Sequence, residues 1–400
     1  MTVVLDRVLG YDDIETGGRY LSVPFDVPPG TSSFEVRLSF DESVAIIDLG
    51  CSGPDGWRGW SGGARRRFVI GAERSTWGYL AGPIEPGTWH VVLGLHAVPA
   101  QGVHAVVRVE TPGPAIGPEA PAPAPMSPMR RRRDLSHLGR NWLAGEMHAH
   151  TLHSDGRLTP AQLLGMASRN GLDFIAVTDH NTVSHHAELP ELGDRYGILT
   201  VPGQEVTTRL GHANAYGDVG WVDFREHPDA WLDQVDAAGG AFSVNHPVAG
   251  DCSWQWHLRR PPHAVEIGHS SLGRDRMDQS PWAWLLATGW SPGHIGGGDY
   301  HGRGGAEPGT CVTWVDAEEP STEGVIDAVR AGRTAFTVGV EGPVVLRIED
   351  EIVTEGASGL VLSEPDGRCR LIRSDSERFP AGDGPYRLET DGRLIVAGCG

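Results

Sequence analysis

The sequence predicts an α/β protein: a parallel β/α barrel in the middle of the chain, preceded by a β-sandwich and followed by a small β appendage. Three observations support this prediction. Residues 33–40 alternate between polar and apolar side chains, as a half-buried strand does. Residues 111–128 hold seven prolines and no aromatic residue, as in an extended linker. Beyond it, most short apolar runs end in His, Asp or Glu, the arrangement expected where barrel strands end.

The length and composition indicate a globular protein with several domains. The chain has 400 residues, more than one ordinary core accommodates, and it is 39% hydrophobic and 21% charged. We predict domain boundaries where the composition changes. These give a β-sandwich over residues 1–110, a Pro-rich linker over 111–140, a barrel over 141–340 and a β appendage over 341–400.

The charge balance restricts the class of partner. A formal net charge of −19 argues against nucleic acid as the main partner and against an anionic membrane surface. All 33 basic residues are Arg, so Schiff-base chemistry on Lys is excluded. Four consecutive Arg at 130–133 could bind a polyanion, but such a run is more often a solvated face. We therefore expect a small-molecule substrate.

The cysteines and the hydropathy pattern bear on the compartment. The five Cys are scattered without CxxC spacing, so we predict no disulfide framework and a reducing environment. The first residues lack a charged segment followed by an apolar one, and no run approaches 18 apolar residues. The pattern predicts a soluble, cytoplasmic protein and leaves the oligomeric state open.

In the first 110 residues we expect short strands separated by Gly and Pro turns, with no helix between them. Besides residues 33–40, the β-rich runs are 44–49, 67–70, 89–95 and 104–109. Trp57, Trp60 and Trp77 are expected in Gly-rich loops. Packing is the more common role for such residues, and a ligand-binding face is the alternative.

In the barrel region we expect strands and helices to alternate. Thr159 as N-cap and Pro160 as the first helical residue predict a helix that stops at Gly171. Two further helices are expected over residues 229–238 and 321–330. Pro202 and Gly203 are expected to form a turn. The predicted strands are residues 142–144, 174–177, 198–201, 241–244, 264–267 and 293–298.

A set of histidines and carboxylates follows these strands. His148 and His150 are two residues apart, so on a strand both side chains would point to one face. Imidazoles combined with carboxylates suit Zn, Mn or Fe better than Mg or Ca. The candidate metal ligands are His148, His150, Asp155, His180, Glu205, His212, His246, Asp299 and His301.

Five motifs carry a resemblance to a known family. HAHTLHSDG, TDH, GQE, NHP and DYH, in this order, resemble the successive signatures of the PHP (polymerase and histidinol phosphatase) superfamily. Within it the chain is most similar to CehA/McbA-type metallohydrolases, over about residues 141–340. The resemblance implies a distorted (β/α)7 barrel with a trinuclear metal site.

The resemblance also implies a role for each ligand. His148, His150, Glu205 and Asp299 would hold a first metal. Glu205 would bridge to a second metal bound by His212 and His246, and Asp155, His180 and His301 would hold a third. Glu205, Asp299 and His301 would be the catalytic residues. His269 stands where this branch is expected to carry Asn, and Asp155 where some members carry His.

This chemistry predicts a hydrolase. Two cations about 3.5–4 Å apart lower the pKa of a shared water toward about 7, and the hydroxide would attack phosphorus or a carbonyl carbon. The same metals would bind the oxygen that gains charge. We expect two or three divalent transition metals and a phosphate mono- or diester as substrate. Arg157, Arg209, Arg274 or Arg303 would clamp the phosphoryl group.

Two alternatives remain open at this point. An amide or carbamate ester hydrolase of the carbaryl-hydrolase type would use the same metals with a more apolar pocket, lined by Trp254, Trp256, His185 and His186. A non-catalytic, metal-stabilised binding protein would instead use the N-terminal domain for recognition. For the enzyme, the expected substrate-binding residues are His269, Arg303, Arg157 and His185.

Overall fold

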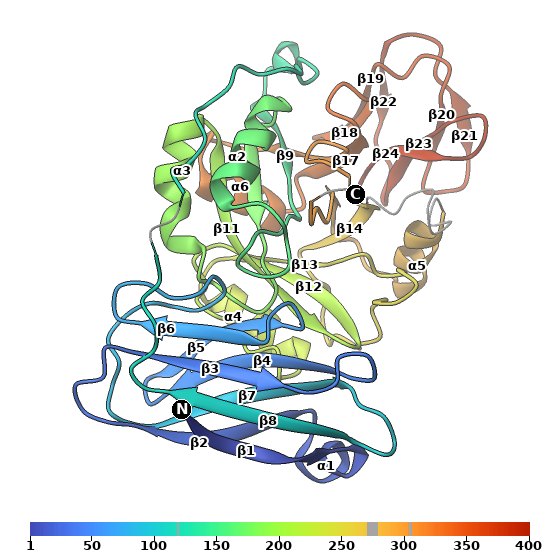
Figure 1. Cartoon of the computed structure of the whole chain (residues 1–400). Coiled ribbons are helices and arrows are strands. Elements are labelled where there is room, and N and C mark those ends of the chain that lie inside the picture. The colour runs from blue at the N-terminus through green and yellow to red at the C-terminus, as the bar shows by residue number, and fades with distance from the viewer. Residues whose placement is uncertain (118–119, 270–278, 303, 305) are drawn as a thin grey trace. The chain divides into compact units, whose positions relative to one another are not determined.

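The computed structural model describes residues 1–117, 120–269, 279–302, 304 and 306–400. The chain separates into two compact units, and most of their elements are labelled in Figure 1. Unit 1 comprises Met1–Pro121 together with two later segments, Leu152–Gly156 and Asp179–Ala187. Unit 2 comprises the remainder of the chain.

Unit 1 contains two four-stranded antiparallel sheets, in the orders β1-β8-β3-β6 and β2-β7-β4-β5. Their apolar faces share one core, in which the Phe34 ring meets the Trp89 ring edge-on with centroids 4.9 Å apart. The two sheets therefore form a sandwich. The strands are β1 (Thr2–Leu9), β2 (Tyr20–Val27), β3 (Ser33–Ser39), β4 (Ile46–Gly53), β5 (Gly56–Gly62), β6 (Arg67–Gly71), β7 (Gly87–Ala97) and β8 (Val103–Glu110).

Strand β3 shows why the alternating pattern predicts a half-buried strand. Its apolar side chains, Phe34, Val36 and Leu38, are buried in the sandwich core, whereas Arg37 is exposed. Glu35 is buried as well, and its carboxylate pairs with Arg37 and Arg67 at 2.7 Å each. The charge inside this strand is tolerated because two guanidinium groups neutralise it.

Two expectations for this unit are wrong. A helix, α1 (Tyr11–Gly17), interrupts the strands, and the Gly10 N–H donates to the Asp13 side chain at 2.9 Å where it begins. Trp57 and Trp60 lie in strand β5 rather than in a loop. Glycines such as Gly59 make this segment resemble a loop in the sequence. In the structure Gly59 has a φ of 141°, and a Cβ there would lie 2.3 Å from the carbonyl oxygen of Gly78. The glycine permits a close approach of two backbone segments.

Unit 2 is built on a curled sheet in which seven strands are consecutive neighbours. Four of the neighbouring pairs are parallel, but β12 is antiparallel to β11 and to β13. The mixed α/β class is confirmed, while this pairing departs from a regular parallel barrel. The strands are β9 (Trp142–Glu146), β10 (Phe174–Val177), β11 (Leu199–Thr208), β12 (Gly211–Tyr216), β13 (Ala241–Val244), β14 (Ala264–His269) and β15 (Gly293–Gly297).

Strand β16 (Cys311–Asp316) brings the two ends of this seven-strand run together. It pairs antiparallel with β9, at one end of the run. The Thr313 hydroxyl donates to the Gly296 carbonyl at 2.7 Å and accepts from the Gly296 N–H at 2.8 Å, in β15 at the other end. The ends of β9 and β15, and the loops that follow them, are thereby brought to one region.

The predicted helices of unit 2 are confirmed, with α3 and α5 added. Thr159 caps α2 by accepting the Gln162 N–H at 3.2 Å, and Ser321 caps α6 by accepting the Gly324 N–H at 3.0 Å. In the described ranges, no helix has both the length and the apolar character required to span a bilayer. The helices are α2 (Pro160–Arg169), α3 (Leu189–Tyr196), α4 (Pro228–Ala237), α5 (Ser280–Thr288) and α6 (Thr322–Arg330), with 3-10 turns at Ser136–Leu138 and His186–Glu188.

The turn expected at Pro202 and Gly203 is wrong. Strand β11 continues through both residues, and Gly203 pairs with Tyr216 of β12. The glycine is needed for packing, because a Cβ there would lie 2.9 Å from the Thr178 methyl group. Glu205 therefore projects from a strand of a hairpin, a more rigid position than a loop.

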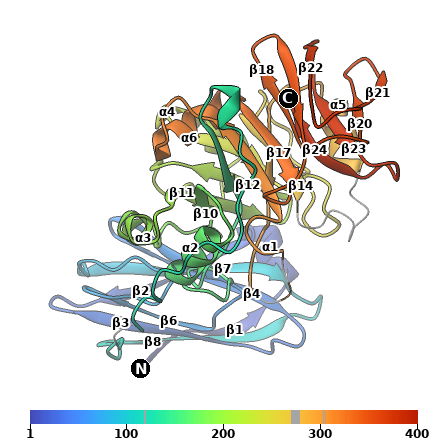
Figure 2. The same ribbon diagram turned by 90° about the horizontal axis from the view of Figure 1, so that it is seen from above.

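The C-terminal strands extend unit 2. Strands β24, β23, β20 and β21 continue the curled sheet beyond β17, and β18, β19 and β22 form a separate sheet (Figure 2). Leu346 and Tyr386 share a core with Leu163 and Ile175. These strands are β17 (Thr334–Val338), β18 (Val344–Ile348), β19 (Glu351–Glu355), β20 (Val361–Ser363), β21 (Cys369–Leu371), β22 (Ser376–Pro380), β23 (Tyr386–Glu389) and β24 (Ile395–Cys399).

Candidate metal centre

The loops after β9 and β15 bring two histidines to one aspartate. The His150 N–H donates to the Tyr300 carbonyl at 3.0 Å, which holds the two loops side by side. The Asp299 Oδ1 atom lies 3.0 Å from His150 Nε2 and 3.4 Å from His148 Nε2. The spacing of two residues between the histidines therefore does place both rings on one carboxylate.

Glu205 lies at the centre of the other predicted ligands of unit 2. It is fully buried, and its Oε1 atom lies 3.1 Å from His148 Nε2, 3.2 Å from His212 Nδ1 and 3.3 Å from His246 Nε2. The other oxygen, Oε2, lies 3.6 Å from His150 Nε2. His212 comes from β12, opposite Thr207 in the hairpin, and His246 follows β13. One carboxylate thus faces four imidazoles.

The electrostatics of this cluster favour a bound cation. Burial lowers the pKa of His148, but the carboxylates of Glu205, Glu266 and Asp299 outweigh burial and hold that pKa well above its ordinary value. Burial raises the pKa of Asp299, but His148, His150 and His269 hold it well below its ordinary value. The buried carboxylates therefore favour a positive charge beside them. A protonated histidine can carry this charge, and a divalent cation can supply it without a proton.

The donor set fits a divalent metal. Imidazole nitrogen and carboxylate oxygen are the ligands that Zn and similar metals take in proteins. Within each group the candidate donor atoms lie within 4.8 Å of one another. The groups inside unit 2 are His148, His150 and Asp299; His148, His246, Glu266 and His269; and His212, His246 and Cys252.

Two buried carboxylates beside His148 were missed in the sequence. Glu266 of β14 has its Oε1 atom 3.0 Å from His148 Nδ1, and its Oε2 accepts the His246 N–H at 2.8 Å. Glu146 accepts the backbone N–H groups of His148 and Gly298, and burial raises its pKa to about 8. The available signal was an acidic residue inside an apolar run, since a buried charge requires partners.

His269 and Cys252 also lie in this cluster. His269, a predicted substrate contact, is buried, with its Nε2 3.5 Å from Asp299 Oδ2. It therefore lies among the candidate ligands. The Cys252 Sγ atom lies 3.4 Å from His246 Nδ1, and no cysteine spacing in the sequence indicated this.

The remaining predicted ligands divide between the units. Asp155 and His180 belong to unit 1, where Asp155 Oδ1 lies 3.5 Å from His180 Nε2. His301 belongs to unit 2, where its ring stacks on that of His150 with centroids 4.1 Å apart. The assignment of these three residues to a third metal stays a prediction.

The predicted substrate contacts other than His269 lie in different environments. His185 is buried in unit 1, with its Nδ1 3.3 Å from Asp179 Oδ2. Arg157 is exposed, and its backbone N–H donates to the His301 carbonyl at 3.0 Å. Arg209 is exposed at the β11–β12 turn. Arg274 and Arg303 lie outside the described residues.

Trp254 and Trp256, which were expected to line an apolar pocket, contact other residues of the chain. Trp254 is buried, and the Trp256 Nε1–H donates to the Thr208 hydroxyl at 3.2 Å. Trp256 therefore contacts strand β11 of the hairpin. Trp254 is held to the segment that follows β13, because its backbone N–H donates to the Pro247 carbonyl at 2.9 Å. Their positions match a packing role.

Backbone strain coincides with the candidate ligands. Five non-glycine residues in the described ranges have positive φ, and three of them lie at the motifs: Asn181 at 54°, His246 at 26° and Asp299 at 48°. This region of backbone conformation is unfavourable for residues with a Cβ. Such residues cluster at functional sites, where the surrounding structure enforces the conformation.

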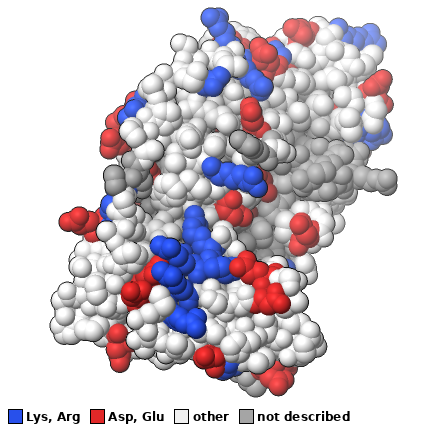
Figure 3. Space-filling model, in the orientation of Figure 1, with Lys and Arg blue, Asp and Glu red and all other residues white. Residues whose placement is uncertain are grey.

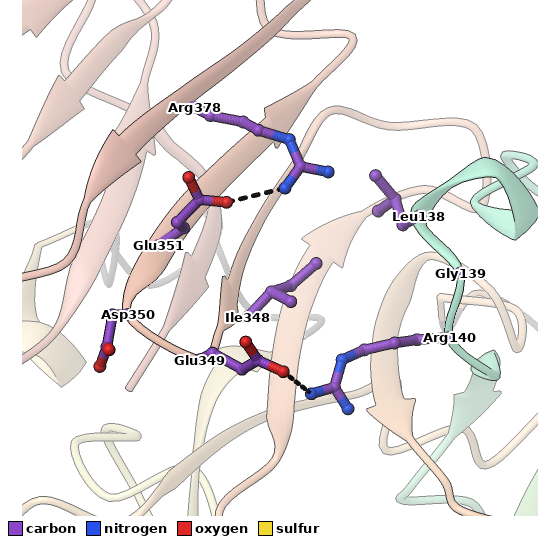
Figure 4. A pocket seen from close by; sticks show the side chains of 8 residues that line it. All are labelled: Leu138, Gly139, Arg140, Ile348, Glu349, Asp350, Glu351 and Arg378. Carbon is purple, nitrogen blue, oxygen red and sulfur yellow. Dashed lines mark hydrogen bonds and ion pairs between the residues drawn. The ribbon is translucent and has the colours of Figure 1, made fainter.

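A pocket elsewhere in unit 2 contains none of the predicted site residues (Figure 4). Its volume is about 460 Å³, and the side chains around it include two ion pairs, Arg140 with Glu349 at 3.5 Å and Arg378 with Glu351 at 2.8 Å. These four charges pair with one another, and Asp350 leaves the lining with one acidic side chain in excess.

No protein-family model matches the sequence. The chain is 24% identical over 121 residues to an uncharacterized protein of Methanocaldococcus jannaschii, covering 28% of this chain and 71% of that protein. It is 37% identical over 62 residues to the phosphoribosyl 1,2-cyclic phosphate 1,2-diphosphodiesterase of Eggerthella lenta, covering 16% of this chain and 24% of that enzyme.

Among solved structures, the chain is similar to a two-domain protein of Bacteroides vulgatus that contains a predicted PHP-like metal-dependent phosphoesterase. The TM-score is 0.43 at 19% identity, and the match covers 69% of this chain and 91% of that one.

Proposed function

We propose that the chain is a metal-dependent hydrolase of the PHP superfamily, of CehA/McbA type, that acts on a phosphate mono- or diester of a small molecule. The observation that carries the proposal is the carboxylate of Glu205, which is fully buried with nitrogen atoms of three histidines within 3.3 Å of one oxygen. A buried carboxylate among imidazoles is a typical site for a divalent cation. The short match to a curated diphosphodiesterase supports the phosphoester class.

The proposed cofactors are two or three divalent transition metals, Zn, Mn or Fe. His148, His150, Glu205 and Asp299 would hold the first, and Glu205 with His212 and His246 the second. Asp155, His180 and His301 would hold the third. When bound, these metals would lower the pKa of a water molecule and stabilise the charge that develops on the substrate.

The protein's own residues orient the ligands. Glu266 lies 3.0 Å from His148 Nδ1, and a hydrogen bond donated by that nitrogen would leave Nε2 free to act as the ligand facing Glu205. The Asn245 amide donates to Glu205 Oε1 at 3.0 Å and limits rotation of the carboxylate. Both contacts are buried, so water does not compete with them.

The charge distribution supports a small substrate. Figure 3 shows one contiguous group of Arg side chains with acidic side chains beside it, and the other charges on this face are scattered. With a net charge of −19, this pattern disfavours a nucleic acid as the main partner. A cytoplasmic location, suggested by free thiols at all five cysteines, belongs to the same proposal.

The test combines metal analysis with a substrate panel. Full-length protein purified without chelator should contain at least about two equivalents of transition metal, as a bridged hydrolytic pair requires. It should hydrolyse p-nitrophenyl phosphate or bis-p-nitrophenyl phosphate faster than an aryl carbamate. Faster carbamate hydrolysis would favour the amide or carbamate alternative. Less than one equivalent of metal, with no gain after reconstitution, would contradict the metal cluster.

A further inference from the structure

We propose that the β-sandwich of unit 1 positions the candidate ligands Asp155 and His180, and that Arg65 is the principal positioning residue. This inference rests on the proposed function, which gives Asp155 and His180 their role as ligands. The segments that carry them, Leu152–Gly156 and Asp179–Ala187, follow β9 and β10 in the sequence, yet they belong to the compact unit of the sandwich.

Arg65 binds the first segment through its backbone. It lies in the turn between β5 and β6 and is half-buried. Its Nη1 donates to the Ser154 carbonyl at 2.9 Å, and its Nη2 donates to the Leu152 carbonyl. A planar guanidinium that bridges two carbonyls fixes both their separation and their direction. Asp155 is the next residue after this bridged segment.

The turn before Tyr79 binds both segments. The Thr182 hydroxyl donates to the Gly78 carbonyl at 2.9 Å, two residues after His180. Gly78 also lies close to the first segment, because a Cβ there would lie 2.6 Å from the His153 carbonyl oxygen. Its φ of 93° likewise favours glycine. This single turn of the sandwich thus holds the two segments that carry the candidate ligands.

The two segments are also bonded to each other. Asp179 Oδ1 accepts the Ser154 N–H at 2.9 Å and the Ser154 hydroxyl at 2.6 Å. His153 Nδ1 lies 2.7 Å from the Ser184 hydroxyl. Ser154, Asp179, Thr182 and His153 are all buried. Because Asp155 and His180 directly follow Ser154 and Asp179, a displacement of this buried network would move both candidate ligands.

The network gives the sandwich a role in positioning the two candidate ligands that unit 1 carries. Asp155 is exposed, and the segment that carries it has no regular secondary structure, so it lacks backbone ladder bonds of its own. Partners beyond the ligands themselves commonly account for tenfold to hundredfold in metal affinity, roughly, because they hold the ligands in place. In this chain, Arg65 and Gly78 of the sandwich supply such partners.

Replacing Arg65 in the full-length chain tests the inference. We expect Arg65→Met to weaken one site at least about tenfold, and so to lower the metal content by about half an equivalent or more at a free Mn²⁺ or Zn²⁺ concentration that just saturates the wild type. Asp155→Asn should lower the content of the same site at least as much, and the double variant should lose no more than Asp155→Asn alone. Equilibrium dialysis with elemental analysis measures each content.

Arg58→Met is the matched control. Arg58 is also half-buried in the sandwich, and it also donates to two carbonyls, those of Leu80 at 3.1 Å and Pro83 at 2.9 Å. Both carbonyls belong to the sandwich, so this variant removes the same kind of bonds without touching the two segments. It should keep the full metal content. Thermal unfolding of both variants shows how far each is destabilised.

The outcomes separate the inference from the proposed function. Loss of metal in Asp155→Asn with full content in Arg65→Met overturns the inference alone. Unchanged metal in Asp155→Asn overturns the ligand role of Asp155, and the inference with it. Equal losses in Arg65→Met and Arg58→Met indicate general destabilisation and also overturn the inference. If Arg65→Met does not fold, Thr182→Val, which removes the bond to Gly78 together with the local bonds to Ser184, must weaken the same site for the inference to stand.

Discussion

Glu205 is the residue whose two oxygens face different histidines, Oε1 toward His148 and Oε2 toward His150. Replacing it with Gln keeps its shape and removes the charge that would allow two cations to lie close together. We expect Glu205→Gln to lose at least one metal and to reduce turnover at least about a hundredfold, comparable to the loss of one transition-state stabiliser. Elemental analysis and steady-state kinetics on the best phosphate ester measure both effects.

Glu389→Gln controls for the loss of any buried carboxylate. Glu389 is also buried, and its carboxylate accepts hydrogen bonds from Ser363 and Arg387 and pairs with Arg393. This variant should lose stability and keep its metals. A Glu205→Gln variant with near-full metal content and turnover would show that Glu205 does not bridge metals.

Asp48 makes stability depend on pH. Burial raises the pKa of this carboxyl to about 7, more than Arg66 and His180 lower it. The folded state therefore holds the proton more tightly than the unfolded state. The contribution of the protonated Asp48 to the free energy of unfolding is complete below about pH 4 and is lost as the pH rises through about 7. This contribution is at most about 4 kcal/mol.

Asp48→Asn should remove this loss, so the free energy of unfolding of the variant should rise relative to the wild type between pH 5 and pH 8. Urea unfolding at both pH values measures the difference. Asp41→Asn serves as the control, because the hydrogen bonds from Ser43 lower the pKa of Asp41, and its titration falls below this range. An equal pH dependence in Asp48→Asn and wild type would contradict the raised pKa.

The sequence indicated the histidines that lie together better than it indicated the other side chains beside them. Motif spacing indicated His148, His150 and Asp299 because ligand types recur after apolar runs. Glu266 lies inside such a run, where an acidic residue indicates that a buried partner exists but does not identify that partner. Cys252 approaches His246 only because the chain folds back after β13, and a contact of this kind has no sequence spacing of its own.

Strand β15 passes so close to the candidate metal centre that its last residue must be glycine. A Cβ at Gly297 would lie 2.3 Å from Glu266 Oε1 and 2.6 Å from the His148 Cβ. We expect Gly297→Ala to displace Glu266 or His148 and to lower metal affinity at least about tenfold, as loss of a ligand-orienting contact does. Isothermal titration with Mn²⁺ or Zn²⁺ measures the affinity.

The control at the same scale is Gly250→Ala. Gly250 is exposed, and a Cβ there would meet no atom within 4 Å. This variant should bind metal as the wild type does. Equal affinities for Gly297→Ala and wild type would mean that Glu266 can move without affecting the centre.

Elements with a strong local signal were predicted, and elements whose signal is contradicted by glycine or proline were not. Helices α2 and α6 begin at the capping residues that the sequence indicates, Thr159 and Ser321. Strand β5 and the middle of β11 contain Gly or Pro at positions where a neighbouring segment approaches closely. In such strands tertiary contact overrides local preference, and a single sequence does not reveal that contact.

At the scale of the whole molecule, the core of the sandwich is self-contained. All of its buried residues lie between Leu9 and Val109. Expression of residues 1–121 should therefore give a folded β protein that binds no transition metal. Circular dichroism and cooperative thermal unfolding check the fold, and elemental analysis checks the metal. An insoluble or unfolded fragment would show that the sandwich depends on the two later segments.

The division of the chain into units could not be predicted from sequence patterns. The Pro-rich stretch indicates a boundary, and the motifs assign Asp155 and His180 to the region after it. The structure places both residues in unit 1, through contacts such as that between Arg65 and Ser154, which are far apart in the sequence. Hydrophobic periodicity reports on neighbours within one element, so it carries no information about such contacts.

The unfavourable backbone at His246 and Asp299 has an evolutionary consequence. Each residue has a positive φ and a polar side chain in a crowded cluster, so each position would favour the proposed function at a cost in stability. A laboratory selection for heat resistance in the presence of a chelator, without a demand for turnover, would favour glycine at these two positions and neutral side chains around them, because no bound metal would then stabilise the ligands. The most thermostable descendants of this chain would then be those that had lost the ability to bind metal.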